Sequence, residues 1–209
     1  TCMMYIYPFS YSDENTTIQL STNDNNIFNL DEVKNVVING ITFRNSSGKA
    51  ISGTDGRYFV IQNCKFIANK VDLTDFRHSG ITTCYFLDTA GKITRDRFDS
   101  LSVQELENDG NFIMNCFIEG SKVTDADLKL SGNNCVMSHN FASDQTDGSF
   151  AGFNGANMYF EYNEGVGNNK VQGDGGSMYS GLVLSANVIT RYNYIHHHGN
   201  TPQFGRLIY

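Results

Sequence analysis

The chain has 209 residues, of which 40% are hydrophobic and 18% charged, and it carries a net charge of −7. An acidic chain without clustered lysine and arginine argues against nucleic acid and anionic membranes as partners, and no apolar stretch is long enough for membrane insertion. Twenty glycines and only 2 prolines, together with many asparagines, indicate a fold rich in tight turns rather than in amphipathic helices.

The first residues (TCMMYIYPF) are typical of a β-strand, and they have neither the basic start nor the cleavage site of a signal peptide. Tyr209 also falls within an expected strand. We therefore expect the chain to be a fragment of a larger protein.

A short pattern recurs along the chain, in which an apolar anchor is followed five positions later by a second residue that is usually apolar. The segments are VVINGITF (36–43), FVIQNCKF (59–66), SGITTCYF (79–86), NFIMNCFI (111–118), VMSHNFA (136–142), YFEYNEG (159–165) and VITRYNYI (188–195). Their anchors are Ile38, Ile61, Ile81, Ile113, Met137, Phe160 and Thr190. Most anchors are separated by about 22 residues, and two longer spacings predict insertions of about eight to ten residues.

A second set of short strands lies between these segments: KAISG, KVDLT, GKITR, LKLSG, SFAGFNG and SMYSG. A coil of about 20–24 residues with two or three short strands and no helix is typical of a parallel β-helix. An antiparallel sandwich would need hairpin turns between successive strands, and a leucine-rich horseshoe would need a leucine-dominated repeat. We predict an all-β, right-handed parallel β-helix (a solenoid) of about seven coils, one domain over residues 1–209 with long loop insertions near 87–110 and 165–187.

Equivalent residues of neighbouring coils should lie about 4.8 Å apart and form columns. Three positions after the anchor, the column is Ile41, Cys64, Cys84, Cys116, Asn140, Asn163 and Asn193. Its last three members predict an asparagine ladder, in which side-chain amides hydrogen-bond from coil to coil. We expect the cysteines to be buried thiols, while a disulfide between Cys64 and Cys84 stays open.

Two more columns follow from the same register. Directly after the anchor, Glu161 and Arg191 should form an ion pair across adjacent coils. One position further on, His139, Tyr162 and Tyr192 should form an aromatic stack. Such a stack either packs the turn or provides a platform for a sugar.

The ordered series of segments resembles the right-handed β-helix proteins of the group that includes glycoside hydrolase family 141. The most specific stretch is YFEYNEG, a loop, GDGGSMYSG, a further loop and NVITRYNYIHHHG, and the resemblance covers nearly the whole chain. It implies an extracellular or cell-surface carbohydrate-active protein, with a glycosidase of plant, algal or host glycans favoured.

The resemblance also implies catalytic residues. It makes Asp174, in GDGGSMYSG, one catalytic acid, and it places a second acidic pair beyond Tyr209. Glycoside hydrolysis needs two carboxyl groups about 5–5.5 Å apart for retention or about 6.5–9.5 Å apart for inversion. Equivalent positions of neighbouring coils are about 4.8 Å apart, and those two coils apart are separated by about 9.6 Å. Asp174 is equally compatible with a simple turn in a glycine-rich loop.

The outer face of the second strand set, with Lys129, Asp174 and Tyr179, is the predicted glycan-binding face. Arg191 and His197 are further candidate substrate-binding residues; relatives tend to have an acidic residue at the position of His197. We predict no cofactor, and no metal at the histidine run 196–198, because consecutive side chains diverge in a strand or turn.

Two alternatives stay open. A polysaccharide lyase would need a base, for which Lys129 and Arg191 are candidates, and a group that neutralises the substrate's carboxylate, often Ca²⁺. A non-catalytic shaft or glycan-binding module of a surface protein would need no chemistry. The net charge of −7 disfavours acidic polysaccharides unless calcium bridges them.

Overall fold

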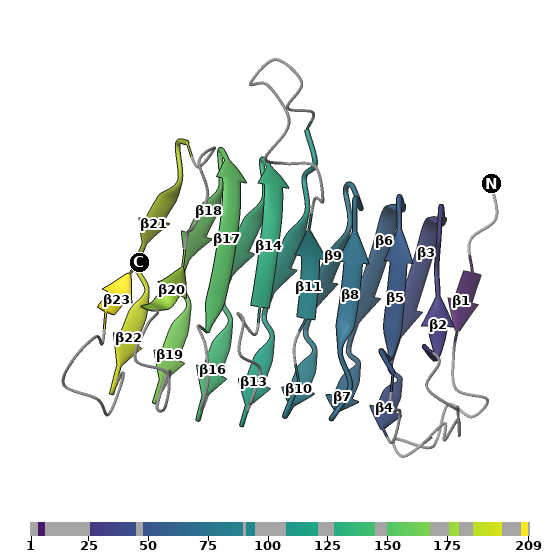
Figure 1. The fold of residues 1–209 in the computed structure, drawn as a ribbon, viewed down its shortest axis with the longest axis horizontal. Helices are drawn as coiled ribbons and strands as arrows, with labels where there is room; N and C mark the ends of the chain where they lie inside the picture. Colours follow the sequence, from purple (N-terminus) through teal and green to yellow (C-terminus); the bar gives the residue numbers. More distant parts are fainter. Residues whose placement is uncertain are drawn as a thin grey trace.

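The fold is given by a computed structural model. It describes residues 4–6, 26–44, 48–89, 91–94, 108–120, 128–144, 150–167, 176–179, 186–197 and 206–208. Within these ranges every regular element is a β-strand, and the strands belong to three sheets whose neighbours all pair in parallel (Figure 1). The predicted parallel β-helix is confirmed.

From β3 onward, each coil contributes one strand to each sheet, in the order A, B, C. Sheet A contains β1 (Met4–Ile6), β3 (Lys34–Asn39), β6 (Arg57–Gln62), β9 (Gly80–Thr82), β12 (Phe112–Met114), β15 (Val136–Ser138), β18 (Tyr159–Glu161) and β21 (Ile189–Arg191). Sheet B contains β4 (Thr42–Arg44), β7 (Lys65–Ile67), β10 (Tyr85–Leu87), β13 (Phe117–Glu119), β16 (Phe141–Ser143), β19 (Glu164–Val166) and β22 (Tyr194–His196). Sheet C contains β2 (Phe28–Asn29), β5 (Ile51–Thr54), β8 (Val71–Thr74), β11 (Gly91–Thr94), β14 (Leu128–Asn133), β17 (Ala151–Ala156), β20 (Gly176–Tyr179) and β23 (Arg206–Ile208).

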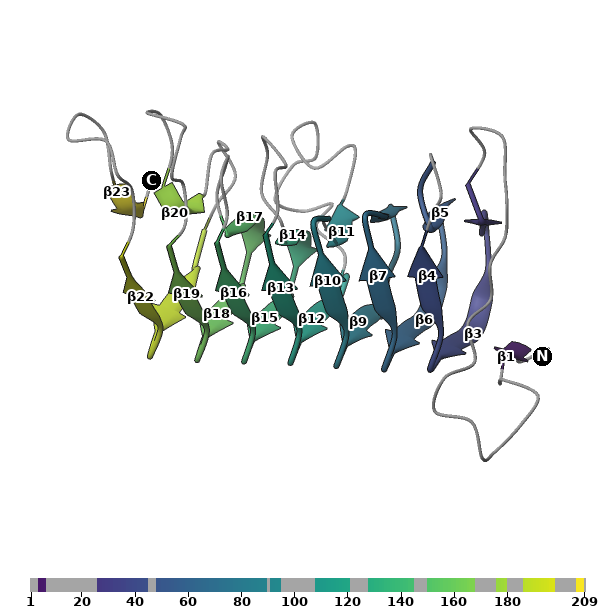
Figure 2. The same ribbon diagram turned by 90° about the horizontal axis from the view of Figure 1, so that it is seen from below.

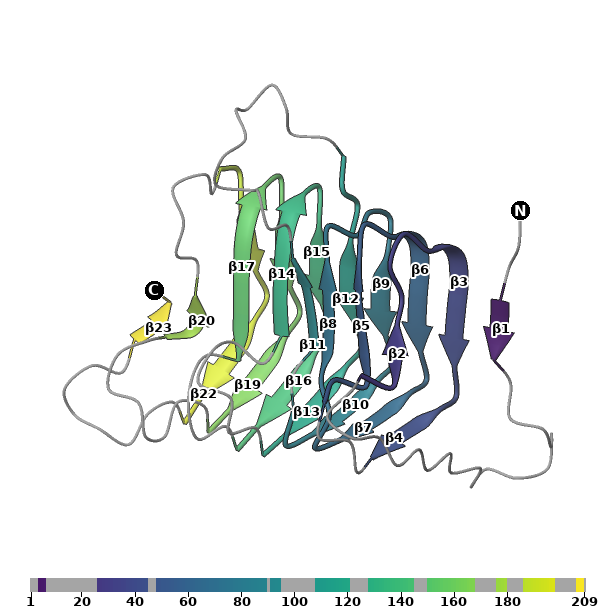
Figure 3. The same cartoon turned by 45° about the vertical axis from the view of Figure 1, so that its right-hand side comes forward.

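The three sheets enclose one elongated core. Sheets A and C face each other, and sheet B closes the side between them (Figure 2 and Figure 3). Followed from the N-terminal end, the chain runs down sheet A, across sheet B and up sheet C, clockwise as it recedes (Figure 1). The coil is therefore right-handed, the hand that parallel crossover connections almost always take.

All six strands of the predicted second set are present, and all belong to sheet C. Five successive coils, β3–β5 to β15–β17, have all three strands described with their side chains, slightly fewer than the about seven coils predicted. The coils that follow repeat the pattern, but for most residues of β20 and β23 the structure describes the backbone and not the side chain. Strands β11 and β20 lie within the two predicted insertions, most of whose other residues fall outside the described ranges.

The sequence pattern does not separate sheets A and B, because each anchor segment has the pattern of one continuous strand. The structure bends each segment once, at a residue with left-handed backbone conformation. These residues are Gly40 (φ 71°), Asn63 (φ 53°), Thr83 (φ 52°), Asn115 (φ 54°), His139 (φ 55°), Tyr162 (φ 56°) and Tyr192 (φ 56°). Glycine and asparagine tolerate this conformation well, whereas threonine and tyrosine adopt it only where the surrounding structure holds them.

Columns of identical or similar apolar side chains fill the interior. The anchors Ile38, Ile61 and Ile81 are fully buried one above another in sheet A. Phe43 and Phe66 stack with ring centroids 5.0 Å apart in sheet B, and the stack continues to Phe86. Burial of each such side chain stabilises the fold by about 1.5–3 kcal/mol, so the core is built from the five-residue spacing seen in the sequence.

The predicted column three positions after the anchor is confirmed. From Cys64 onward, each member donates a side-chain hydrogen bond to the carbonyl of the anchor one coil earlier, whether the donor is a thiol or an amide. Cys84 Sγ lies 3.7 Å from the carbonyl oxygen of Ile61, and Asn163 Nδ2 lies 3.1 Å from that of Met137. Cysteine and asparagine therefore serve the same turn, which explains why both occur in this column.

The cysteines of this column are free thiols, so Cys64 and Cys84 form no disulfide. A hydrogen bond between the two side chains, together with burial, raises the pKa of the Cys64 thiol far above its ordinary value. A hydrogen bond with Cys116 and burial likewise raise the pKa of Cys84. The three cysteines are buried and pack as small core residues, as predicted.

Candidate ligand-binding face

The corner between sheets A and B has the same length in every coil. Residues 40–41 join β3 to β4, residues 192–193 join β21 to β22, and the five corners between them are also two residues long. The connections on either side of sheet C vary instead. Residues 95–111 separate β11 from β12, whereas only residues 134–135 separate β14 from β15. Because binding sites of repeat folds gather where loops vary, a ligand site is expected on the sheet C side.

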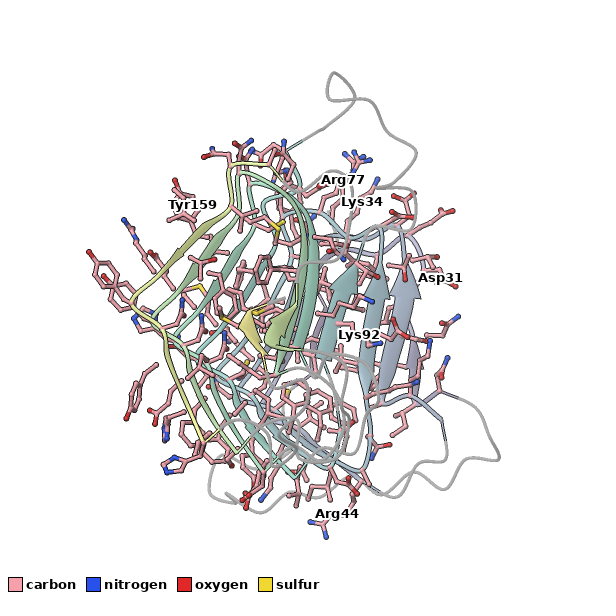
Figure 4. The ribbon with its side chains drawn as sticks, turned by 60° about the vertical axis from the view of Figure 1, so that its left-hand side comes forward. Asp31, Lys34, Arg44, Arg77, Lys92 and Tyr159 are labelled. Atoms are coloured by element: carbon pink, nitrogen blue, oxygen red, sulfur yellow. The ribbon has the colours of Figure 1, made fainter. Side chains whose placement is uncertain are left out.

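One outward-facing column of sheet C carries charged side chains on three successive coils. Asp72 is in register with Lys92, and Lys92 with Lys129, on three successive coils. Lys129 is in register with Gly152, and Gly152 with Tyr179. Figure 4 shows Lys92 over the outer side of sheet C. With about 4.8 Å between coils, these five positions, here called the sheet C column, extend over roughly 19 Å.

Some outward-facing positions of sheet C on β14 and β17 are buried. Leu130 points into the core, so alternation along the strand turns Ser131 outward. Ser131 is nonetheless only 5% exposed, and its register partner Asn154 only 9%. Thr74, which also faces outward two coils earlier, is half-buried. The polar groups of Ser131 and Asn154 are therefore shielded from bulk water, and both residues already interact with other parts of the protein.

Charges of both signs lie at the start of the sheet C column. Lys49 Nζ is 2.7 Å from Asp72 Oδ2, and both side chains are partly exposed. A pair of this kind contributes at most about 1 kcal/mol to folding. The two following positions, Lys92 and Lys129, place two ammonium groups one coil apart, which provides hydrogen-bond donors for hydroxyl or carboxylate oxygens.

The structure brings together two of the five predicted site residues. Lys129 and Tyr179 are two coils apart in the sheet C column, with Gly152 between them. Asp174 lies outside the described residues. Arg191 belongs to sheet A and His197 follows β22 of sheet B, so neither shares a sheet with Lys129.

Arg191 has the partner that the register predicted. Its Nε lies 2.7 Å from Glu161 Oε2, and its guanidinium carbon lies 5.5 Å from the centre of the Tyr192 ring. The hydrogen bond to Glu161 and its charge raise the pKa of Arg191. On the same sheet, Tyr159 projects to the outside of the coil (Figure 4).

The predicted aromatic stack at the corner of sheets A and B is confirmed. His139 and Tyr162 stack with ring centroids 5.0 Å apart, and Tyr162 and Tyr192 repeat that distance. Each ring is nearly parallel to the next, so the inner faces of the stack are covered by neighbouring rings. A sugar stacks on a ring face rather than on its edge. The arrangement therefore favours packing over a sugar platform for these three rings.

Sequence reasoning did not single out Glu164, although its position carries a signal. The residue four positions after each anchor forms an outward column in sheet B, in which Glu164 follows Phe141 and precedes Tyr194. Glu164 Oε1 lies 3.2 Å from His196 Nε2. An acidic residue is thus held beside the histidine run.

Comparison with known proteins finds no matching family model and no matching curated protein. In the part of the chain that the structure describes, no helix is long and apolar enough to span a membrane. Within the same residues, no three His, Cys, Asp or Glu side chains form a group that could hold a metal ion. Function is therefore inferred from the arrangement of this chain's own residues.

Proposed function

We propose that this β-helix is a carbohydrate-active protein that binds an extended glycan along the outer face of sheet C. The observation that carries the proposal is that the connections of variable length border sheet C, on the side where Asp72, Lys92 and Lys129 form a polar column. Hydrogen-bonding groups repeated about every 4.8 Å along a straight line suit a long polymer rich in hydroxyls. Compact small molecules are usually held in concave, mainly apolar sites instead.

The reaction that we propose is glycoside hydrolysis, as the resemblance to family 141 glycosidases implies. Asp174 would be one carboxyl group, and Tyr179 and Lys129 would contact the substrate. Asp174 precedes β20, whose partner on the next coil is β23. The second acid expected beyond Tyr209 would follow β23, at the opposite end of this strand pair from Asp174, so the two carboxyl groups would be further apart than the coil spacing of about 4.8 Å, and the pairing alone selects neither retention nor inversion.

A polysaccharide lyase has less support. Its two candidate basic groups, Lys129 in β14 and Arg191 in β21, belong to different sheets, and Arg191 is paired with Glu161. A lyase of acidic polymers would also need calcium to offset the net charge of −7. A non-catalytic glycan-binding module would use the same face of sheet C without bond cleavage.

The three functions give different products from a panel of mixed glycans. Hydrolysis by the intact protein releases reducing ends, whereas a lyase also produces unsaturated sugars that absorb in the ultraviolet. We expect reducing ends without unsaturated products, and their loss in Asp174→Asn. Turnover that persists in Asp174→Asn would overturn the role of Asp174, and glycan binding without either product would indicate a binding module.

The binding face has its own test. Lys129→Ala should weaken glycan binding about tenfold, the effect of losing one charged hydrogen bond of about 1.5 kcal/mol. Lys65→Ala is the matched control, because Lys65 is an exposed lysine in sheet B. Equal effects of the two substitutions would exclude the outer face of sheet C as the binding surface.

A further inference from the structure

Two consecutive histidines at the end of β22 hold their rings together. His196 Nδ1 and His197 Nδ1 are 2.7 Å apart, and the ring planes meet at 71°. Consecutive side chains of an extended strand point to opposite faces, so this contact needs a special backbone. His197 has a left-handed backbone with φ 52°, which ends the alternation and turns its ring toward His196.

The neighbours of His196 determine which nitrogen of its ring carries the hydrogen. Glu164 Oε1 lies 3.2 Å from His196 Nε2, so that nitrogen carries the hydrogen and donates it to the carboxylate. The Nδ1 atom of the same ring then has a lone pair, directed at His197. The ring of Tyr194 stacks on His196 with centroids 4.4 Å apart and restricts its rotation. A carboxylate that binds the far nitrogen of a histidine is the usual outer partner of a metal-ligating imidazole.

We propose that His196 and His197 chelate a divalent transition-metal ion through their two Nδ1 atoms. At metal–nitrogen distances of about 2.0–2.1 Å, two ligand nitrogens lie about 2.9 Å apart at a right angle and about 3.4 Å apart at the tetrahedral angle. The pair has to open slightly from 2.7 Å, and His197 is exposed and can rotate. The proton that now joins the two Nδ1 atoms moves to Nε2 of His197, so both lone pairs face the ion.

The donor set determines which ions bind. Neutral imidazole nitrogens suit Cu²⁺, Ni²⁺ and Zn²⁺, with Cu²⁺ the tightest of the three, whereas Ca²⁺ and Mg²⁺ require oxygen ligands. Two protein ligands leave the remaining positions to water. His196 is the last residue of β22 in sheet B, and His197 comes directly after it. The metal site therefore does not depend on the proposed glycan function of sheet C.

The test is calorimetric titration of the untagged protein with CuCl₂, and separately with CaCl₂. We expect Cu²⁺ to bind and Ca²⁺ to leave the site unchanged. His197→Asn keeps a residue that tolerates the left-handed turn, and His196→Phe keeps a ring beside Tyr194, so both variants should fold. Each should weaken Cu²⁺ binding on the order of 100-fold, because each removes half of a chelate. Electron paramagnetic resonance should count two nitrogen ligands in the protein and one in each variant.

Two further variants separate the site from other histidines. Glu164→Leu should weaken Cu²⁺ binding about tenfold through its effect on His196, while the nitrogen count stays at two. His139→Ala removes an exposed histidine in the corner of sheets A and B and should leave Cu²⁺ binding unchanged. Binding that survives in both His196→Phe and His197→Asn, or that is lost only in His198→Ala, would overturn the proposal.

Discussion

Asn163 accepts two hydrogen bonds from Asn140, the equivalent residue of the preceding coil. The backbone nitrogen and Nδ2 of Asn140 each lie 3.0 Å from the same oxygen, Asn163 Oδ1. Both residues are almost fully buried. The side chain of one asparagine thus holds the turn of the preceding coil, and coil-to-coil register is carried by polar groups inside the molecule.

Replacement of Asn163 with alanine should destabilise the protein by about 3 kcal/mol. The substitution leaves the buried backbone nitrogen of Asn140 without its partner, which costs about 1–3 kcal/mol, and it also removes a buried hydrogen bond to the carbonyl of Met137, worth about 1 kcal/mol more. Chemical denaturation measures the free energy of unfolding. Asn39→Ala is the control: Asn39, in β3, accepts an exposed hydrogen bond from Asn63 Nδ2, and the loss of that hydrogen bond should cost less than about 0.5 kcal/mol. Similar losses in both variants would contradict a structural ladder.

Gly155→Ala should also cost about 3 kcal/mol, for a steric reason. A Cβ at Gly155 would lie 1.9 Å from the backbone oxygen of Gly132, its register partner on the preceding coil, and backbone cannot give way as a side chain can. Gly120 has a left-handed backbone, φ 67°, with open space around it. Gly120→Ala should therefore cost only about 1 kcal/mol, the cost of placing alanine in a left-handed backbone conformation. Thermal unfolding of the two variants compares them, and equal melting temperatures would show that β14 and β17 can separate.

The buried thiols should not react with a disulfide reagent such as DTNB while the protein is folded. Cys64, Cys84, Cys116 and Cys135 are all buried, and the raised pKa values of Cys64 and Cys84 remove the reactive thiolate at neutral pH. In a Cys2→Ser background, we expect four thiols to react only after denaturation. Thr83→Cys places a thiol on the exposed neighbour of Cys84 and should react at once. Fast reaction without that added thiol would mean that the coil opens locally.

The sequence predicted the repeat well because each coil uses the same inward positions. The spacing from Ile61 to Phe66 recurs as Ile81 to Phe86, and stacked coils must bury equivalent residues together. The division into sheets A and B was less accessible, because Thr83 carries no signal for a left-handed turn.

The chemistry of the surface was hardest to predict. Consecutive histidines were expected to diverge, and they meet only because His197 adopts a left-handed backbone. Lys129 and Tyr179 were correctly assigned to the second strand set, but their exact alignment through Gly152 depends on pairing register. A repeat fixes which residues form a column, whereas contacts between columns depend on backbone angles that a single sequence does not reveal.

Tyr85 should titrate well above the ordinary pKa of a tyrosine side chain. Tyr85 Oη donates to Glu119 Oε2 at 2.6 Å, and this hydrogen bond, with some burial and the nearby negative charge, raises the pKa of Tyr85 to about 12. The unfolded chain loses this proton near pH 10. The stabilisation by the pair is therefore complete below about pH 10 and is lost as the pH rises toward about 12, because the unfolded state releases the proton first.

Ultraviolet absorbance of tyrosinate during a pH titration measures this pKa. The step near pH 12 should disappear in Tyr85→Phe and should move down toward pH 10 in Glu119→Gln, which keeps an acceptor oxygen but removes the charge. Glu161→Gln removes a carboxylate from sheet A and should leave the step in place. A late step that persists in Tyr85→Phe would assign it to another tyrosine, and an unchanged step in Glu119→Gln would mean that the carboxylate charge of Glu119 does not raise the pKa.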